Sequence, residues 1–441
     1  MTKFFGVVLA ISGMLAGPVQ SADPALLIKD VTLIDGTGAP PLEKASVLVI
    51  GDRIAQISPG KISAPRGAEV INGKGKYLMP GIINSHIHLP GGRSGRGNRD
   101  LVMNVELGTE AMHGMLYAGV TAIYDSGNHD NYAFKMRDEE QAGRILGPRL
   151  FTTGRLLTHP KGYQCCAGGL QVTDYASALP GIDALIARKP DMVKFTRESR
   201  GMGAESENLT LIPLDDMKKM IDRFHDAGIR VTVHVSDEQL ARESITAGVD
   251  AFAHPVYLTE ATIGLARTLA AKRIPVSTTL GRADTDGTVF DQPIFAATMT
   301  DEDRAENKTN PMYQGSAAGS WRGNLMTAIK KNLKAMYDAG AILAMGTDRS
   351  MGAYVHREME LMAEAGIPNL QIIRMSTLNA AIYMGKDEDL GSIERGKLAD
   401  MLLLTADPVA DIHNTVKIEA VFKGGQKIDR SKLNVPSNKK S

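Results

Sequence analysis

Hydrophobic and polar positions along the chain follow one pattern at its two ends and another between them. Residues 26–36 and 45–57 form short apolar runs that Gly, Asp and Pro interrupt, with a turn at Gly51-Asp52. Such runs predict short β-strands joined by tight turns. Similar runs return at residues 399–404 and 420–428. We therefore expect the chain ends, residues 22–77 and 386–430, to pair in one small β-sandwich.

Between these ends, apolar runs of strand length alternate with amphipathic segments of helix length, which is typical of βα units around a parallel sheet. Helical periodicity is clearest over residues 215–227, 237–247 and 325–339. Eight strands are predicted, at residues 81–88, 120–125, 149–154, 192–196, 230–235, 251–254, 275–279 and 342–348. Eight repeats indicate an α/β fold with a (β/α)8 TIM barrel over residues 78–385, whose active sites lie at the C-terminal strand ends. An open doubly wound sheet is the alternative, but no Gly-x-Gly-x-x-Gly turn follows an early strand.

One long insertion, residues 281–319, lies between the seventh strand and its helix. It exceeds an ordinary loop and carries Phe290, Phe295 and Tyr313, with Trp321 just beyond it. Two interpretations stay open: a lid over the barrel mouth, or a surface excursion unrelated to substrate. The polar and basic tail, residues 431–441, is expected to fray.

The first residues resemble a secretory signal peptide. A positive start is followed by a short apolar run up to Gly17, and Val19-Gln20-Ser21 then offers residues suited to cleavage. The run is too short to span a bilayer as a stable helix, so we expect residues 1–21 to be removed from a secreted or periplasmic protein. No cysteine follows the run, so a lipid anchor is not indicated there.

Composition narrows the expected partners. Lysine plus arginine equals aspartate plus glutamate, at 50 each, which gives no footprint for nucleic acid or for an anionic membrane surface. The two cysteines, Cys165 and Cys166, are adjacent, so they form no disulfide framework and are either two thiols or a strained, labile bridge. We expect a small-molecule substrate and no membrane anchor; a homo-oligomer is compatible with the sequence.

Candidate metal ligands lie at the predicted strand ends. His86 and His88 end the first strand, and residues two apart in a strand point the same way. A lone His-x-His is more often two ordinary polar residues. However, other strands add further candidates, namely Lys194, His234, His254 and Asp348. Because catalytic residues in a barrel come from the ends of several strands, we expect all six to converge.

The chemistry of this set suits Zn²⁺, Mn²⁺ or Co²⁺, for which imidazole and carboxylate are good ligands. A lysine ammonium is cationic and only donates, so it is no ligand. Two interpretations of Lys194 follow. It either extends toward an acidic partner, or it is carbamylated by CO₂ into an anionic group that bridges two ions. Because four histidines also lie at strand ends, the carbamylated, bridging form of Lys194 is favoured.

Several motifs together resemble the amidohydrolase superfamily, in its imidazolonepropionase-like and prolidase-like branch, over nearly the whole mature chain. They are Leu78-Met79-Pro80-Gly81 before His86-Ile87-His88, Val193-Lys194-Phe195, His234, His254-Pro255, Gly346-Thr347-Asp348, and the segments 376–381 and 391–400. The resemblance implies a (β/α)8 barrel with a β-sandwich and two divalent metal ions, with Zn²⁺ expected. His86, His88 and Asp348 would hold the more buried ion. His234 and His254 would hold the other, and carboxylated Lys194 would bridge them.

The resemblance also implies a reaction. A hydroxide shared by the metals would attack a carbonyl, and Asp348 would carry the proton to the leaving nitrogen. The substrates implied are dipeptides or N-acyl amino acids, cleaved at an amide bond as by a prolidase or carboxypeptidase. Their free carboxylate needs a cation, and Arg197, just beyond the fourth strand, is the candidate. His159 and Tyr163, in the loop after the third strand, are further candidate substrate contacts; each of the three is otherwise a solvated loop residue.

Other functions stay open at this point. Mononuclear deaminases of the superfamily carry a glutamate three residues after the fifth-strand histidine and lack the bridging lysine. Here that position is Asp237, and Lys194 is present, so hydrolysis is favoured. A lactonase, carbamate hydrolase or phosphotriester hydrolase on the same scaffold differs only in pocket shape. A non-catalytic binding protein is disfavoured, since unused ligands at a barrel mouth only cost desolvation.

Overall fold

The structure is a computed structural model that describes residues 24–92, 103–165, 168–200, 208–258, 260–310 and 321–439. The expected signal peptide, Cys166 and Tyr313 lie outside these ranges, so the predictions made for them stay predictions. Within the described ranges, no helix combines the length and apolar character needed to cross a membrane.

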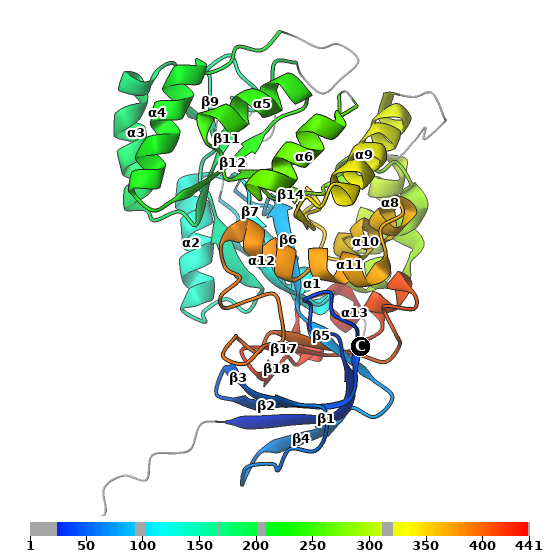
Figure 1. Cartoon of the computed structure of the whole chain (residues 1–441). Coiled ribbons are helices and arrows are strands. Elements are labelled where there is room, and N and C mark those ends of the chain that lie inside the picture. The colour runs from blue at the N-terminus through cyan, green and yellow to red at the C-terminus, as the bar shows by residue number, and fades with distance from the viewer. Residues whose placement is uncertain are drawn as a thin grey trace, which may run out of the picture.

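The two chain ends share one eight-stranded sheet. Its strands are β1 (Ala25–Leu33), β2 (Leu42–Ile50), β3 (Arg53–Ser58), β4 (Glu69–Asn72), β5 (Tyr77–Pro80), β16 (Met401–Leu404), β17 (Ile418–Lys423) and β18 (Gln426–Lys427). The ends meet where β5 and β16 pair antiparallel, with Met79 opposite Leu402. Figure 1 shows this chain-end sheet below the rest of the molecule. It has a hydrophobic cluster of its own, which includes Ile28, Val47 and Phe422.

Eight parallel strands occupy the eight predicted positions. They are β6 (Ile82–Ile87), β7 (Val120–Asp125), β8 (Arg149–Thr152), β11 (Met192–Thr196), β12 (Arg230–His234), β13 (Ala251–Phe252), β14 (Val276–Ser277) and β15 (Leu343–Ala344). The first three form one sheet; the other five form a second, extended at one edge by β9 (Leu157–Thr158) and β10 (Leu170–Gln171). Backbone hydrogen bonds link the two sheets at both ends, from Ser85 N to Met345 O (2.9 Å) and from Asp191 N to Thr152 O (3.0 Å).

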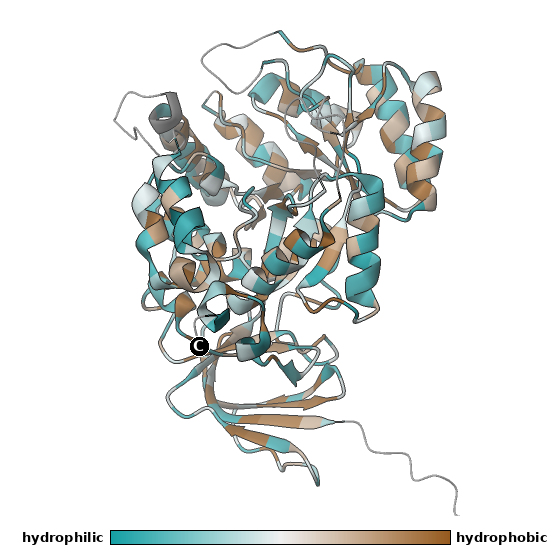
Figure 2. Ribbon diagram, turned by 180° about the vertical axis from the view of Figure 1, so that it is seen from behind, coloured by the Kyte–Doolittle hydropathy of each residue, from teal (hydrophilic) through white to brown (hydrophobic). Residues whose placement is uncertain are grey.

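Amphipathic helices follow most of these strands. They are α1 (Val105–Tyr117), α2 (Asp130–Gln141), α3 (Tyr175–Ala187), α4 (Leu214–Asp226), α5 (Glu238–Ala247), α6 (Ile263–Lys272), α9 (Trp321–Asp338), α10 (Tyr354–Glu364), α11 (Asn369–Met375) and α12 (Leu378–Met384). The three helices predicted from periodicity correspond to α4, α5 and α9. In α4 the buried Met217, Met220, Ile221 and Phe224 recur at three- and four-residue spacing, which gives one apolar face. In Figure 2 the outer helices carry both teal and brown residues.

The described part of the insertion is packed against the body of the molecule. It contains η1 (Leu280–Arg282), η2 (Gly287–Asp291), α7 (Pro293–Thr298) and α8 (Asp301–Thr309). Phe290 and Phe295 are fully buried in a cluster with Tyr354 of α10, and the rings of Phe295 and Tyr354 are 5.8 Å apart. These two aromatic side chains therefore anchor the insertion to α10. Residues 311–320 lie outside the described ranges, so the lid stays a prediction.

The described part of the tail contains secondary structure and buried side chains, while its expected fraying stays a prediction. Residues 430–439 form η4 (Arg430–Lys432) and α13 (Pro436–Lys439). Leu433 and Val435 between them are buried, and Asn434 N donates to His113 Nδ1 of α1 at 2.9 Å. Two buried apolar side chains and this backbone amide thus help to dock a segment that is polar on average.

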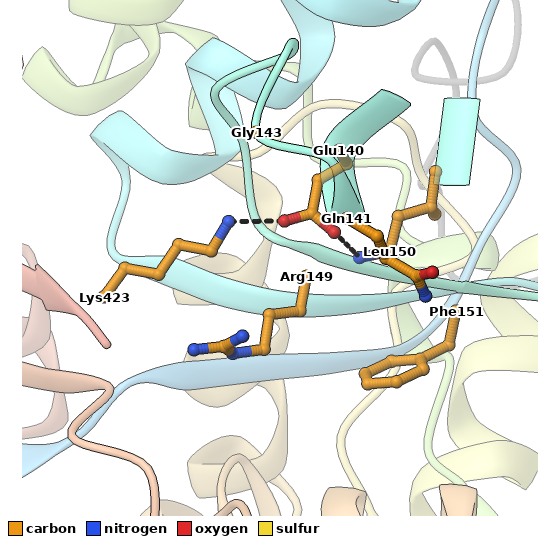
Figure 3. A pocket seen from close by; sticks show the side chains of 7 residues that line it. All are labelled: Glu140, Gln141, Gly143, Arg149, Leu150, Phe151 and Lys423. Atoms are coloured by element: carbon orange, nitrogen blue, oxygen red, sulfur yellow. Dashed lines mark hydrogen bonds and ion pairs between the residues drawn. The ribbon is translucent and has the colours of Figure 1, made fainter. Parts of the chain in front are cut away.

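A hollow of about 300 Å³ lies where the chain-end sheet meets α2 and β8 (Figure 3). Two ion pairs cross this junction. The buried Glu140 carboxylate accepts from Lys423 Nζ at 2.5 Å and from Leu150 N at 3.1 Å. Arg149 binds Asp400 with both Nε (2.7 Å) and Nη2 (3.1 Å). The charges that line the hollow are therefore engaged in joining the two parts of the fold.

Replacing Lys423 with Met is expected to lower the free energy of unfolding by about 3 kcal/mol, because Glu140 would keep a buried charge without its cation. Denaturant titration of wild type and variant measures the difference. Lys218→Met is the matched control, since Lys218 pairs with Asp222 on the surface and its loss should cost less than about 1 kcal/mol. Equal effects of the two substitutions would mean that the junction pair does not stabilise the fold.

Candidate metal centre

Three of the predicted ligands form a compact group. His86 and His88 extend from the end of β6, and Asp348 lies just after β15. Their candidate donor atoms all lie within 4.8 Å of one another. Asp348 Oδ1 is 3.7 Å from His86 Nε2 and 3.5 Å from His88 Nε2. His86 is fully buried, whereas the side chains of His88 and Asp348 keep exposures of 15% and 18%. The group is therefore open on the side of His88 and Asp348.

The other three predicted ligands adjoin this group. Lys194 Nζ lies 3.2 Å from His86 Nε2. The ring of His254 is 4.7 Å from the rings of both His86 and His234. Lys194, His234 and His254 are all buried. The structure thus brings together six side chains that come from five strands, as the positions of the parallel strand ends predict.

Neighbouring groups fix the orientation of the imidazole rings. His88 Nδ1 lies 2.8 Å from the carbonyl oxygen of Gly127, and His254 Nδ1 lies 2.9 Å from Thr279 Oγ1, which directs Nε2 of each ring inward. His234 is turned the other way, because its Nε2 contacts Glu198 Oε2 and the Tyr257 hydroxyl, both at 3.3 Å. Metal-binding histidines characteristically engage their second nitrogen in this manner.

Burial keeps these rings neutral. It lowers the pKa of His86 and of His254 well below the usual value, and the nearby cations Lys194 and Arg282 lower both further. Burial likewise lowers the pKa of His234 to about 4, against the opposing effect of Glu198. A metal ligand must offer an unprotonated nitrogen, and these three histidines do so at neutral pH.

Two residues at the site have backbones in the left-handed region. Thr279 has φ 41° and Asp348 has φ 50°. This conformation is uncommon for any residue with a side chain and is an outlier for a β-branched one such as Thr279. Thr279 contacts His254, and Asp348 is itself a candidate ligand. Strained backbone gathered at one place is typical of a functional site.

Three residues that sequence reasoning missed complete the site: Glu198, Tyr257 and Arg282. Glu198 accepts from Ser236 Oγ (2.6 Å) and from the Tyr257 hydroxyl (3.1 Å) beside His234. Arg282 Nη1 lies 4.0 Å from Asp348 Oδ2. Glu198 and Arg282 follow predicted strands by two or three residues. Their position just after a strand is a signal for site residues, but many loop residues that lie outside the site have the same position.

The three predicted substrate contacts lie in different surroundings. Tyr163 stacks on the His234 ring at 4.4 Å, so it belongs to the site. His159 is half-buried and accepts from Lys161 N within its own turn. Arg197 points elsewhere: its Nε donates to Glu243 Oε2 of α5 at 3.0 Å and its Nη1 to the Ile212 carbonyl at 3.0 Å. The structure therefore corrects the expectation for Arg197, because a carboxylate on α5 already holds its guanidinium.

Residues 77–428 match the family model described as Amidohydrolase family. The chain belongs to this family. An uncharacterized protein of Mycobacterium tuberculosis is 30% identical over 284 residues, which are 60% of this chain and 70% of that protein. The imidazolonepropionase of Alkaliphilus oremlandii is 26% identical over 401 residues, 86% of this chain and 89% of its own. A solved Xaa-Pro dipeptidase with bound methionine in its active site has a similar fold, with TM-score 0.74, 21% identity and coverage of 92% of this chain and 99% of that one.

A buried acid of this amidohydrolase, Glu358, holds the turn that carries two residues of the site. Glu358 of α10 accepts hydrogen bonds from Thr278 Oγ1 (2.6 Å), Leu280 N (2.8 Å) and Gly281 N (2.7 Å). These donors belong to the turn after β14 that carries Thr279 and Arg282. Burial raises the pKa of Glu358 to about 7, although the three hydrogen bonds oppose the shift.

Glu358 should make the stability of this amidohydrolase depend on pH. Its folded-state pKa exceeds the unfolded value of 4.5, so its contribution is complete below pH 4.5 and is lost as the pH rises through about 7. The free energy of unfolding should fall over this interval by up to about 1.4 kcal/mol per pH unit from this group alone. Denaturant titrations at pH 5 and pH 7.5 compare wild type with Glu358→Gln. The variant should lack this component; an unchanged pH slope would contradict it.

Proposed function

We propose that this amidohydrolase is a secreted or periplasmic binuclear enzyme that cleaves the amide bond of a dipeptide or an N-acyl amino acid. The observation that carries the proposal is the meeting of six candidate ligands from five strands, with three neutral histidines among them. The two linked parallel sheets support a closed (β/α)8 barrel, and the chain-end sheet supports its β-sandwich. Export rests on the signal-like N-terminus alone.

The side chains present fit two divalent ions. His86, His88 and Asp348 would hold one of them, His234 and His254 would hold the other, and carboxylated Lys194 would bind both. Carbamylation would replace a cation that lies 3.2 Å from His86 by an anionic donor, which removes the repulsion between Lys194 and any bound ion. Bound Zn²⁺, or a similar ion, polarises a carbonyl and lowers the pKa of a water molecule.

The chain's own residues would perform the remaining steps. Asp348 accepts a proton from the attacking water and delivers it to the leaving nitrogen, which needs a carboxylate that substrate can reach. Its partial exposure, together with that of His88, supports an approach of substrate from this side. Tyr163, stacked on His234, would form part of the wall of the pocket.

One contact favours hydrolysis over deamination. The side chain of Asp237, which occupies the position of the deaminase glutamate, caps α5 by accepting from Leu240 N at 2.9 Å. A carboxylate engaged in a helix cap is not placed for proton transfer at the ligands. The mononuclear deaminase alternative therefore has less support than the hydrolase.

Elemental analysis and a substrate screen test the proposal. We expect close to two divalent ions per mature chain and hydrolysis of at least one member of a panel of dipeptides and N-acyl amino acids. Chelation should abolish this activity and added Zn²⁺ should restore it. Activity on lactones, carbamates or phosphotriesters in the same screen, with none on amides, would overturn the choice of substrate while leaving the metal centre in place.

A further inference from the structure

A buried arginine reaches the candidate metal centre from the turn after β14. The side chain of Arg282 is only 8% exposed. Its Nη1 lies 4.0 Å from Asp348 Oδ2, its Nη2 donates to the Tyr163 hydroxyl at 3.2 Å, and its guanidinium lies over the ring of Tyr257 at 4.9 Å. The guanidinium thus contacts two tyrosines, and both of these tyrosines flank His234. It also lies near Asp348, on the open side of the candidate ligand group.

The charge of Arg282 bears on which substrates the site favours. An arginine stays protonated at any ordinary pH, and burying it costs free energy unless an anion is close. Asp348, at 4.0 Å, is itself a candidate metal ligand, so bound ions would share its charge. Two divalent ions would make the surroundings more positive still. A substrate that carries a carboxylate would be attracted to these positive charges, whereas a neutral one would not.

Hydrogen bonds to the backbone amide and the carbonyl of Gly281, the preceding residue, hold Arg282 in place. Gly281 N donates to Glu358, and the Gly281 carbonyl accepts from Arg349 Nε (2.9 Å) and Nη2 (2.7 Å). A Cβ at Gly281 would lie 2.8 Å from the Tyr354 ring, so only glycine permits this close packing. A group fixed before substrate arrives loses little conformational entropy on binding it.

We propose that Arg282, with the Tyr163 hydroxyl beside it, binds the carboxylate of the substrate and makes the enzyme selective for amides whose amine part is a free amino acid. Tyr163 accepts from Arg282, so its own hydroxyl proton remains for a second hydrogen bond to the carboxylate. The planar guanidinium offers a fork that matches a carboxylate. The inference rests on the proposed function. Arg282 would have the role that the sequence suggested for Arg197.

Matched ligands test the proposal: N-acetyl-L-leucine and glycyl-L-leucine, and the same compounds with a C-terminal carboxamide. Binding to the metal-loaded protein is measured by calorimetry, and kcat and KM are measured for every compound that is cleaved. Arg282→Met should weaken binding of the carboxylates roughly 100-fold, as expected when one partner of a buried charge pair is removed. Affinity for the carboxamides and the metal content should not change. Arg282→Lys should recover about a tenth of the affinity, because lysine keeps the charge but not the fork.

Arg197→Met is the matched control, because its guanidinium is held by Glu243 and its loss should leave the carboxylate preference intact. The inference would be overturned if Arg282→Met lost affinity equally for carboxylates and carboxamides, or if its metal content fell. It would also be overturned if the wild type did not prefer carboxylates. None of these outcomes would contradict amide hydrolysis. Conversely, preferential carboxylate binding that depends on Arg282, without cleavage of any amide, would uphold the inference and reject the proposed function.

Discussion

Lys194→Ala is expected to reduce the metal content from about two divalent ions per chain to about one or fewer, and to abolish measurable hydrolysis. Lys194 Nζ lies 3.2 Å from His86 and is buried among the candidate ligands. Alanine cannot be carbamylated, so the two ions would lose their shared anionic donor. Elemental analysis of both proteins, purified in parallel, measures the effect.

Lys386→Ala serves as the control for Lys194→Ala, because Lys386 is a half-buried lysine that pairs with Asp191 away from the ligands. Its metal content should equal that of wild type. A short carboxylic acid added to Lys194→Ala should restore part of the activity, since it supplies a carboxylate where the carbamate is missing. About one ion per chain in wild type, unaffected by the substitution, would reject the bridge and bring the deaminase alternative forward.

Asp348→Asn is expected to reduce kcat by about 10³-fold or more, because one side chain would lose both its proton-transfer role and part of its ligand charge. The carboxamide has nearly the same shape, so the packing of the left-handed residue at φ 50° should survive. Measuring kcat together with metal content separates the two losses. Asp237→Asn is the control, because Asp237 only caps α5. Full turnover and full metal content in Asp348→Asn would refute the acid/base role.

Much of the candidate ligand group could be predicted from the sequence because its geometry follows from strand periodicity. His86 and His88 lie two residues apart in one strand, and parallel strands end at one edge, so His234, His254 and Asp348 had to be near them. The eight strands could be predicted for a similar reason, because each is an apolar run of strand length in the sequence. Alternation of apolar and polar residues is a local property, and one sequence is enough to read it.

The substrate-facing loops could not be predicted in this way. Arg197 and Arg282 both follow a strand closely, yet one turns to Glu243 of α5 and the other into the site. The direction of Arg282 depends on a left-handed threonine at 279 and on Glu358, which lies 77 residues beyond Gly281 along the chain. No short-range pattern encodes either contact. The docking of residues 433–435 was missed for a similar reason, because Leu433 and Val435 are buried and Asn434 N donates to His113 of α1, more than 300 residues earlier.

The pairing of β5 with β16 has a consequence for the order in which the protein matures. β5 leads through Gly81 directly into β6, the strand of His86 and His88, and Gly81 N donates to the Asp400 carbonyl at 2.9 Å. The strand that presents the first two histidines is therefore supported by residues near the end of the chain. During synthesis, a chain that has not yet emerged beyond residue 400 lacks this support. His86 and His88 would therefore reach their final positions only after the C-terminal part of the chain has been made.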